Sequence, residues 1–367
     1  MKRIGYLYEK ICDMDNLRKA HKNARKGKGW YKEVREVDEN EDEMLLELQT
    51  MLKNHTFKTS EYEVFTKTEG TKERTIYKLP YYPDRIVQWA ILQVIEPYII
   101  RHFITDTYSA IPGRGIHKCA ERIKHMIQTD AENCKYCLKI DIRHYYQSIN
   151  HNILKQKFRK LFKDKELLWI LDEIIDSIET ADEEDLKILY PHGGFESTGI
   201  PIGNYLSQYC GNYYLSDFDH WLKEEQHEKY VFRYMDDIVI FGNSKEHLHV
   251  LKEKIVEYLT SLKLVLKANW QVFPTFVRGI DYVGYRFFRG YTLLRKGICK
   301  RMKQKMKHIL TKEKSGIMMN LSEWCSIPSY RGWISHCSGF RFTEKYISPL
   351  NEYWQKYYRI EIRRKAA

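Results

Sequence analysis

The stretch FRYMDDIVIFGN, residues 232–243, places two adjacent carboxylates, Asp236 and Asp237, between short apolar segments. β-Branched and aromatic residues flank the pair and favour a hairpin of two strands, 230–234 and 238–241, with the carboxylates at its turn. Adjacent acidic side chains repel each other and are costly to bury without a partner. The pair is therefore either an ordinary turn dipeptide or part of a site that binds a cation.

The pattern of apolar residues predicts the elements on either side of this hairpin. Residues 136–141 are typical of a buried strand that ends at Asp141, and residues 203–222 are typical of a helix. An amphipathic helix is expected over 246–264, followed by a strand over 264–269. Strand, helix, hairpin, helix and strand in this order form a split β-α-β arrangement. The predicted fold class is therefore α+β, with an antiparallel sheet backed by helices.

This arrangement predicts that Asp141 lies beside the hairpin turn, although it is distant from Asp236 in the sequence. Three carboxylates within a few ångströms of one another would take up protons unless a cation joins them. Two Mg²⁺ ions about 3.5–4 Å apart would neutralise Asp141, Asp236 and Asp237 and leave ligand positions for phosphate oxygens. The three residues are therefore candidate metal ligands for an in-line displacement at phosphorus.

Composition narrows the class of protein. The 367 residues are 43% hydrophobic and 14% aromatic, which predicts a folded chain of two or three subdomains. The chain has neither the ~20-residue apolar run that spans a bilayer nor the apolar core of a secretory signal, so a cytosolic protein without a membrane partner is expected. Of the eight cysteines, only Cys134 and Cys137 are close together, and they lack further zinc ligands. They are interpreted as buried thiols.

Positive charge is concentrated at the C-terminal end. Residues 291–367 hold 17 Lys and Arg and five Glu, and so account for the whole net charge of +12. A basic segment of this size suggests a polyanion such as a nucleic acid as partner, although a solvated surface has a similar composition. Contacts with phosphates would be largely independent of sequence and would weaken strongly with added salt.

The residues Tyr234-Met235-Asp236-Asp237 resemble the YxDD box of reverse transcriptases. Other segments resemble, in the same order, further blocks of group II intron-like reverse transcriptases: 71–88 and 108–123 the fingers, 138–151 motif A, 193–219 motif B, 280–288 the primer-grip hairpin and 330–341 the thumb. The resemblance implies a right-hand polymerase and an RNA-directed DNA polymerase activity, a nucleotidyltransferase reaction with two Mg²⁺ ions, or Mn²⁺. It implies fingers with a basic N-terminal extension over 1–135, a palm over 136–290 with a helical insertion near 150–190, and a basic helical thumb over 291–367.

The same resemblance implies roles for single residues. Asp141, Asp236, Asp237 and the backbone carbonyl of Ile142 match metal ligands, and Tyr146 matches the aromatic residue that excludes a ribose 2′-hydroxyl, with a core aromatic as the alternative. Lys267 is a candidate for the acid that protonates pyrophosphate, although Trp270 stands where related enzymes often carry a lysine. Arg74, Lys67 and Lys72 match dNTP-binding residues, with exposed lysines that contact nothing as the alternative for the last two. The basic residues expected to contact nucleic acid are Arg85, Arg114, Arg295, Lys300, Lys303 and Lys307.

Motif B departs from the group II intron pattern, in which Gln-Gly-x-x-x-Ser-Pro is usual. This chain has Ile202-Gly203-x-x-x-Ser207-Gln208, which resembles the reverse transcriptases of diversity-generating retroelements. Those enzymes copy a template-repeat RNA into cDNA with errors at adenines, for mutagenic retrohoming. Ile202 lacks an amide that could hold the nascent base pair, and one lost hydrogen bond lowers selectivity by a factor of about 2 to 13. Plain packing is the alternative role for Ile202.

The resemblance also implies partners. A small basic accessory variability protein that forms a helical oligomer would act with this enzyme on the template-repeat RNA and cDNA, in the cytoplasm and from a bacterial or phage-encoded gene. No RNase H or endonuclease domain is expected after the thumb. A retron, defence-associated or group II intron-derived reverse transcriptase without adenine mutagenesis is the first alternative. An RNA-binding scaffold without activity is the second, and the three aspartates argue against it.

Overall fold

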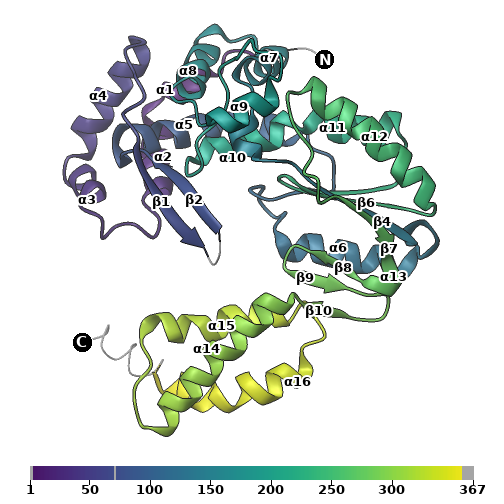
Figure 1. Cartoon of the computed structure of the whole chain (residues 1–367). Coiled ribbons are helices and arrows are strands. Elements are labelled where there is room, and N and C mark those ends of the chain that lie inside the picture. The colour runs from purple at the N-terminus through teal and green to yellow at the C-terminus, as the bar shows by residue number, and fades with distance from the viewer. Residues whose placement is uncertain (1–2, 70–71, 358–367) are drawn as a thin grey trace.

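The computed structural model describes residues 3–69 and 72–357, arranged as Figure 1 shows. Its centre is a five-stranded sheet with the strand order β3-β5-β6-β4-β7. Neighbouring strands are antiparallel except for β3 and β5, which are parallel. The predicted hairpin and the predicted strand that ends at Asp141 are confirmed. The strands are β3 (Thr107–Tyr108), β4 (Tyr136–Asp141), β5 (Tyr230–Tyr234), β6 (Asp237–Gly242) and β7 (Gln271–Pro274).

Side chains of the central strands alternate between two apolar layers, as the pleat of a strand requires. Leu138 and Ile240 belong to a buried cluster that also contains residues of α10 and α12. Cys137 and Val239 face the other side, in a cluster with residues of α6. Cys134 and Cys137 are both free and buried, as expected. The helices are α6 (Ile116–Thr129), α10 (Tyr205–Tyr214), α11 (Ser216–His220) and α12 (Lys245–Ser261).

The N-terminal helices form a group beside the sheet, and a long hairpin projects from them (Figure 1). The most apolar of these helices, α5, buries Ile86, Ala90, Ile91 and Ile95 in the same cluster as Leu138 and Ile240. The elements are α1 (Tyr8–Cys12), α2 (Met14–Ala24), α3 (Lys32–Glu39), α4 (Glu41–Lys53), β1 (Glu63–Glu69), β2 (Lys72–Lys78), an irregular turn at Tyr81–Arg85 and α5 (Ile86–Ile100).

Three helices between β4 and α10 occupy the segment where a helical insertion is expected. They are α7 (His151–Leu161), α8 (Lys165–Ile175) and α9 (Glu183–Leu189). Asn150 and Asp164 cap the first two of these helices by accepting hydrogen bonds from backbone N–H groups of their first turns. Phe158 and Leu171 join the same buried cluster as residues of α5, α10 and α12. The insertion is therefore packed on the central body.

The C-terminal part consists of a small sheet followed by helices with a core of their own. The sheet has the order β10-β9-β8, and Met306, Ile309 and Ile327 belong to a separate buried cluster of the helices. None of the helices in residues 3–69 and 72–357 is long and apolar enough to cross a membrane. The elements are α13 (Thr275–Arg278), β8 (Ile280–Tyr282), β9 (Tyr285–Phe287), β10 (Thr292–Leu294), α14 (Lys296–Lys314), α15 (Leu321–Ile334), α16 (Phe340–Phe342) and the turns Thr343–Ile347 and Ser348–Leu350.

The predicted strand over 264–269 is wrong. Only Leu266 pairs there, through an isolated bridge to Ile142, and the strand beside β4 is β7. Lys263 has a left-handed backbone that ends the preceding helix, and a turn at 268–269 separates the bridge from β7. Turn residues therefore shorten the pairing to one position.

The helix predicted over 203–222 is divided. Helix α10 ends at Tyr214 and α11 begins at Ser216, whose hydroxyl donates a 2.8 Å hydrogen bond to the carbonyl of Tyr213. Serine competes in this way with the regular helical hydrogen bonds.

Two elements that precede residue 136 pack with the central sheet. Strand β3 pairs with β5, and α6 covers one face of the sheet. The segment expected to form the fingers therefore also contributes to this sheet layer.

Candidate active site

Strands β4 and β6 bring two of the candidate carboxylates directly opposite each other. In their antiparallel register Asp141 pairs with Asp237. Asp236 lies one residue earlier, in the turn that joins β5 to β6. Met235, also in this turn, has a left-handed backbone with φ of 55°, which costs a non-glycine residue roughly 1–2 kcal/mol. The strand end and the hairpin turn therefore meet, as the split β-α-β arrangement predicts.

Two lysines partly neutralise these carboxylates. Lys267 Nζ lies 2.8 Å from Asp141 Oδ2, and Lys139 Nζ lies 3.5 Å from Asp237 Oδ1. Burial, and then the negative charge of Asp141, raise the pKa of Asp236 to about 6. Burial also raises the pKa of Asp237, against the opposing charge of Lys139. Asp236 is therefore a carboxylate whose charged form would gain from an additional cation.

The donor atoms at this place suit a hard divalent cation. Oδ1 of Asp141 and Oδ1 of Asp237 are buried and accept no hydrogen bond, and the second of them has only the ion pair with Lys139 at 3.5 Å. Both residues line a cavity of about 580 Å³. Carboxylate oxygens are among the ligands that such cations prefer. The residues present therefore fit a metal ion at the Asp141–Asp237 pair.

The described side chains do not form a ready-made cluster of metal ligands. Across residues 3–69 and 72–357, no three His, Cys, Asp or Glu residues are grouped as a metal site would require. Asp237 and Asp141 are instead ion-paired with Lys139 and Lys267. The bridge between Ile142 and Leu266 is flanked by hydrogen bonds from Lys267 N to Asp141 O and from Arg143 N to Val265 O. The carbonyl of Ile142 takes part in neither bond.

Tyr146 lies beside the turn that carries Asp236. Its hydroxyl is 3.7 Å from the sulfur of Met235. Burial, and then the charge of Asp236, raise the pKa of Tyr146 above its ordinary value, which keeps the phenol neutral. A Cβ atom added at Gly211 of α10 would lie 3.6 Å from the Tyr146 ring. The ring is therefore held between α10 and the turn that carries Asp236.

The candidate dNTP-binding residues are on the projecting hairpin. Lys67 of β1 is directly opposite Arg74 of β2, and both residues are exposed. Lys72 is the first residue of β2, and its side chain lies outside the described part of the structure. The β1–β2 register therefore places Lys67 and Arg74 side by side across the hairpin.

The motif B turn is attached to this hairpin by its backbone. The carbonyl of Ile202 accepts a 3.1 Å hydrogen bond from the N–H of Tyr77 in β2. Gly203 has φ of 126°, and a Cβ atom added there would lie 2.9 Å from the carbonyl oxygen of Tyr77. Only glycine fits this close approach without strain. Ile202 is half-buried, Ser207 is buried in α10, and Gln208 is exposed.

Gln88 supports the start of the motif B helix and is a residue that the sequence reasoning missed. Its side-chain oxygen accepts hydrogen bonds from the backbone N–H groups of Tyr205, at 3.1 Å, and Leu206, at 3.4 Å. It therefore caps the start of α10, which Asn204 does not cap with its own side chain. The signal in the sequence is a glutamine within the apolar run of α5, where a buried polar group needs a partner.

Tyr282 is a second residue that was missed. Its buried hydroxyl, on β8, lies 2.8 Å from the carbonyl oxygen of Asp237 and 3.2 Å from that of Phe232. The ammonium of Lys139 lies 2.7 Å from the carbonyl oxygen of Asp281, next to Tyr282. A lysine within the otherwise apolar strand β4 was the available signal. The predicted primer-grip hairpin is thus bonded to the two strands that carry the YMDD turn.

The basic candidates differ in their surroundings. Arg114 donates a 2.8 Å hydrogen bond to the carbonyl of Ile104 and therefore supports a local turn. Arg85 is half-buried, and its Nε has no hydrogen-bond partner. Arg295 is paired with Asp281. Lys300, Lys303 and Lys307 are exposed on α14.

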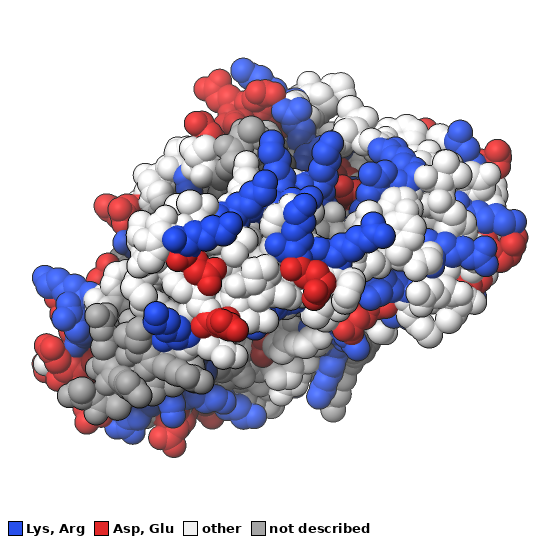
Figure 2. Space-filling view, turned by 90° about the horizontal axis from the view of Figure 1, so that it is seen from below, with Lys and Arg blue, Asp and Glu red and all other residues white. Residues whose placement is uncertain are grey.

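Basic side chains gather across one face of the molecule. Figure 2 shows this face from below, the side on which α14 to α16 lie in Figure 1, with Lys and Arg across its middle and fewer acidic residues. α14 alone carries Lys300, Arg301, Lys303 and Lys307 among its exposed residues. The positive charge noted in the sequence is therefore displayed on the surface.

Comparison with known proteins places these observations in a family. The model of the family "Reverse transcriptase (RNA-dependent DNA polymerase)" matches residues 66–287, more than half of the chain. Protein YkfC of Escherichia coli (strain K12) is 24% identical over 249 residues, which are 58% of this chain and 62% of that protein. The chain therefore spans less than two thirds of the length of this relative.

Among solved structures, telomerase of Candida albicans in complex with a TWJ fragment of telomeric RNA is 12% identical with a TM-score of 0.49, over 70% of this chain and 52% of that chain. A truncated apo telomerase of Candida tropicalis is 13% identical with a TM-score of 0.47, over 65% of this chain and 55% of that chain. The family match includes β4, the YMDD turn and the motif B segment. The chain belongs to the reverse transcriptase (RNA-dependent DNA polymerase) family.

Proposed function

We propose that this protein is an RNA-templated DNA polymerase whose active centre is formed by Asp141, Asp236 and Asp237. The observation that carries the proposal is the register of β4 and β6, which sets Asp141 opposite Asp237 while Asp236 in the adjacent turn has a pKa raised to about 6. Two Mg²⁺ ions, or Mn²⁺, would be held by these carboxylates and by the carbonyl of Ile142. Bound there, they would supply positive charge for the attacking hydroxyl and the phosphate oxygens.

The surrounding residues support this chemistry through position and charge. Tyr146 would close the side of the site where a ribose 2′-hydroxyl would project, since its ring is held between α10 and the turn. Arg74 and Lys67, level with each other on the hairpin, would bind the triphosphate, and the planar fork of arginine suits phosphate oxygens. Lys267, ion-paired to Asp141, is the candidate proton donor to pyrophosphate.

The division into fingers, palm and thumb follows the same proposal. Fingers over 1–135, a palm over 136–290 and a thumb over 291–367 are supported by the separate core of the C-terminal helices. β3 and α6 would belong to the palm in packing, although they precede residue 136. A template–primer duplex would contact the exposed lysines of α14 through its phosphates.

The test is primer extension by the purified chain on an RNA template with Mg²⁺ and dNTPs. The wild type should extend the primer, and Asp236→Asn should lower the rate by at least about a hundredfold, because a ligand of both ions would be lost. Asp42→Asn is the matched control, since Asp42 is an exposed carboxylate paired with Arg18 at 2.9 Å. Equal extension by wild type and Asp236→Asn would contradict the proposed polymerase activity and leave the RNA-binding scaffold as the remaining function.

At a finer level, we propose that the enzyme belongs to a diversity-generating retroelement. The support is motif B, where Ile202 stands before Gly203 and Ser207-Gln208 closes the pattern. The backbone of Ile202 is fixed to Tyr77, so its apolar side chain is held in place without an amide to offer. The partners would then be a template-repeat RNA, its cDNA and an accessory variability protein. A retron, defence-associated or intron-derived enzyme is the alternative.

Sequencing of cDNA separates these two readings. Products made from the enzyme's own RNA, with and without the accessory protein, should carry substitutions concentrated at template adenines. A uniform low error rate would favour the alternative. Ile202→Gln should reduce errors by a factor of about 2 to 13, the value of one hydrogen bond. An error spectrum equal to that of the parent would remove Ile202 from the explanation.

A further inference from the structure

A buried arginine lies two residues before the catalytic turn. Arg233 of β5 is fully buried, with 0% of its side chain exposed. Its partner Asp219, on α11, is equally buried. A buried ion pair of this kind is weak evidence for stability, because removing two charges from water is costly. Its presence beside the turn therefore calls for another explanation.

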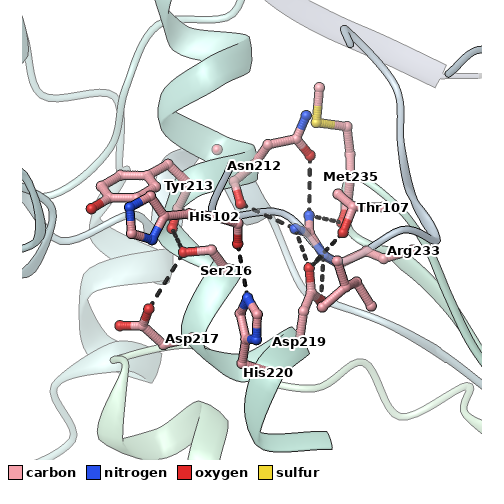
Figure 3. A network of polar contacts seen from close by, with 12 residues as sticks. His102, Thr107, Asn212, Tyr213, Ser216, Asp217, Asp219, His220, Arg233 and Met235 are labelled. Carbon is pink, nitrogen blue, oxygen red and sulfur yellow. Dashed lines mark hydrogen bonds and ion pairs between the residues drawn. The ribbon is translucent and has the colours of Figure 1, made fainter. Parts of the chain in front are cut away.

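Arg233 uses all five of its N–H donors, as Figure 3 shows. Nε donates to Oδ1 of Asp219 at 2.7 Å, and Nη2 donates to Oδ2 of Asp219 at 2.6 Å and to the carbonyl of Asn212 at 3.0 Å. Nη1 donates to Oδ1 of Asn212 at 3.1 Å and to the carbonyl of Met235 at 3.2 Å. One guanidinium group thus joins α10, α11 and the turn.

The acceptors are themselves held by other elements. Thr107 of β3 donates a 2.9 Å hydrogen bond to Oδ2 of Asp219. The side-chain amide of Asn212 donates a 2.8 Å hydrogen bond to the carbonyl of Ser109. The two side chains that bind Arg233 are therefore hydrogen-bonded to the segment that contains β3, and the network ends at Met235, the left-handed residue next to Asp236.

We propose that Arg233 is a positioning residue for catalysis. By bonding the carbonyl of Met235, it fixes the left-handed turn that presents Asp236 to the metal ions and keeps the Met235 sulfur against Tyr146. The charge of Asp219 allows the guanidinium to be buried, and Asn212 sets its orientation. This inference rests on the proposed polymerase function.

A lysine at position 233 could not make the same set of hydrogen bonds. It would keep the charge next to Asp219, but its compact ammonium has three donors and no planar fork, so it cannot span Asp219, Asn212 and Met235 together. In Arg233→Lys the turn should therefore lose its support while the ion pair survives. A displacement of about 1 Å at a catalytic group can lower the rate by about a hundredfold.

The experiment measures single-nucleotide incorporation on an RNA template, with rates divided by the folded fraction from circular dichroism. Arg233→Lys should lower kcat by about ten- to a hundredfold and change KM for the dNTP by less than about threefold. The matched control is Arg159→Lys, which alters an Arg–Asp pair between α7 and α8. Arg159 bonds the carboxylate of Asp172 and the carbonyl of Lys155, and neither residue belongs to the turn. It should leave kcat and KM unchanged.

A second variant covers the case in which Arg233→Lys does not fold. Asn212→Ala removes one acceptor of Nη1 and leaves the Arg233–Asp219 ion pair, so kcat should fall by a smaller factor, about three- to tenfold. A wild-type kcat per folded molecule in Arg233→Lys, or in Asn212→Ala if the first is unfolded, would overturn the inference. An inactive wild type would instead contradict the proposed function, so the two failures are distinguishable.

Discussion

Lys267 and Asp141 are joined twice, because the Lys267 ammonium lies 2.8 Å from Asp141 Oδ2 and the Lys267 N–H donates a 2.9 Å hydrogen bond to the Asp141 carbonyl. The backbone bond fixes the lysine at the end of β4, and its side chain then neutralises the carboxylate. The same ammonium also acts on Asp236, whose pKa it lowers against the effects of burial and of Asp141.

Substitutions of Lys267 should show whether this lysine acts as a proton donor or only as a counter-ion of Asp141. Lys267→Met should slow nucleotide incorporation by about a hundredfold or more if Lys267 protonates pyrophosphate. Lys267→Arg keeps the ion pair but is a poor acid at neutral pH, so it should be slowed to a similar degree. Single-turnover incorporation rates are the measurement, with Lys254→Met, a lysine bonded to Gln226, as control. Full activity of Lys267→Arg would show that only the charge matters.

The raised pKa of Asp236 predicts a pH-dependent stability in metal-free buffer. The folded pKa is about 6, and the unfolded value is about 4. The folded state therefore binds the proton more tightly, and the cost of the buried charge appears as pH rises from about 4 to 6 and is complete above that range. Asp236→Asn should thus stabilise the protein relative to wild type at pH 7.5, on the order of 1–3 kcal/mol, and less at pH 5.

Urea denaturation of both proteins at the two pH values, with chelator present, measures this difference. Added Mg²⁺ should stabilise the wild type more than Asp236→Asn, because the ion would bind the carboxylate in the folded state only. A difference between the two proteins that does not change with pH would contradict the assigned pKa.

Tyr146 should control the choice of sugar. Tyr146→Ala removes the ring held between α10 and Met235, so ribonucleotides should be incorporated more readily relative to deoxynucleotides, by about tenfold or more. The measurement is the ratio of kcat/KM for the two nucleotides. Tyr145→Phe is a control on the neighbouring residue, where only a hydroxyl bonded to the Gly211 carbonyl is lost. An unchanged ratio in Tyr146→Ala would assign this ring to the core alone.

Gly203→Ala should be strongly destabilising. The new Cβ would lie 2.9 Å from the Tyr77 carbonyl in addition to the strain of φ 126°, for a total cost of roughly 2–4 kcal/mol. Gly113→Ala is the matched control, since Gly113 has φ of 72° with nothing within 4 Å of the added atom. Gly203→Ala should lose more unfolding free energy than Gly113→Ala, by the cost of the contact together with the greater backbone strain at φ 126°. Equal destabilisation would mean that the turn moves away from β2 without cost.

The elements that the sequence predicts well are those with a simple apolar period. The short apolar runs within 136–141 and 230–242 are sufficient to predict the strands, and the order of the elements then predicts the place of Asp141 opposite the hairpin turn. The strand predicted over 264–269 failed because a left-handed Lys263 and a later turn limit the pairing to Leu266. Apolar content alone contains no signal for such turns.

Long-range polar contacts were beyond the reach of the sequence. Arg233 and Gln88 each stand in an apolar segment, which indicates a buried polar group but not its partner. Asp219 and the N–H groups of Tyr205 and Leu206 come from elements that only the fold brings near. The candidate carboxylates could be named because their motif is short and local. The polar groups that hold these carboxylates in place could not be named, because their partners are distant in the sequence.

The hydroxyl of Tyr282 has a further consequence for how a primer would be received. It bonds the β8 hairpin to the carbonyls on either side of the YMDD turn within one chain. The spacing between that hairpin and the carboxylates is thus established before any nucleic acid arrives. If the protein is the polymerase proposed above, a primer terminus that docks on this hairpin would spend little binding energy on bringing the hairpin and the carboxylates together.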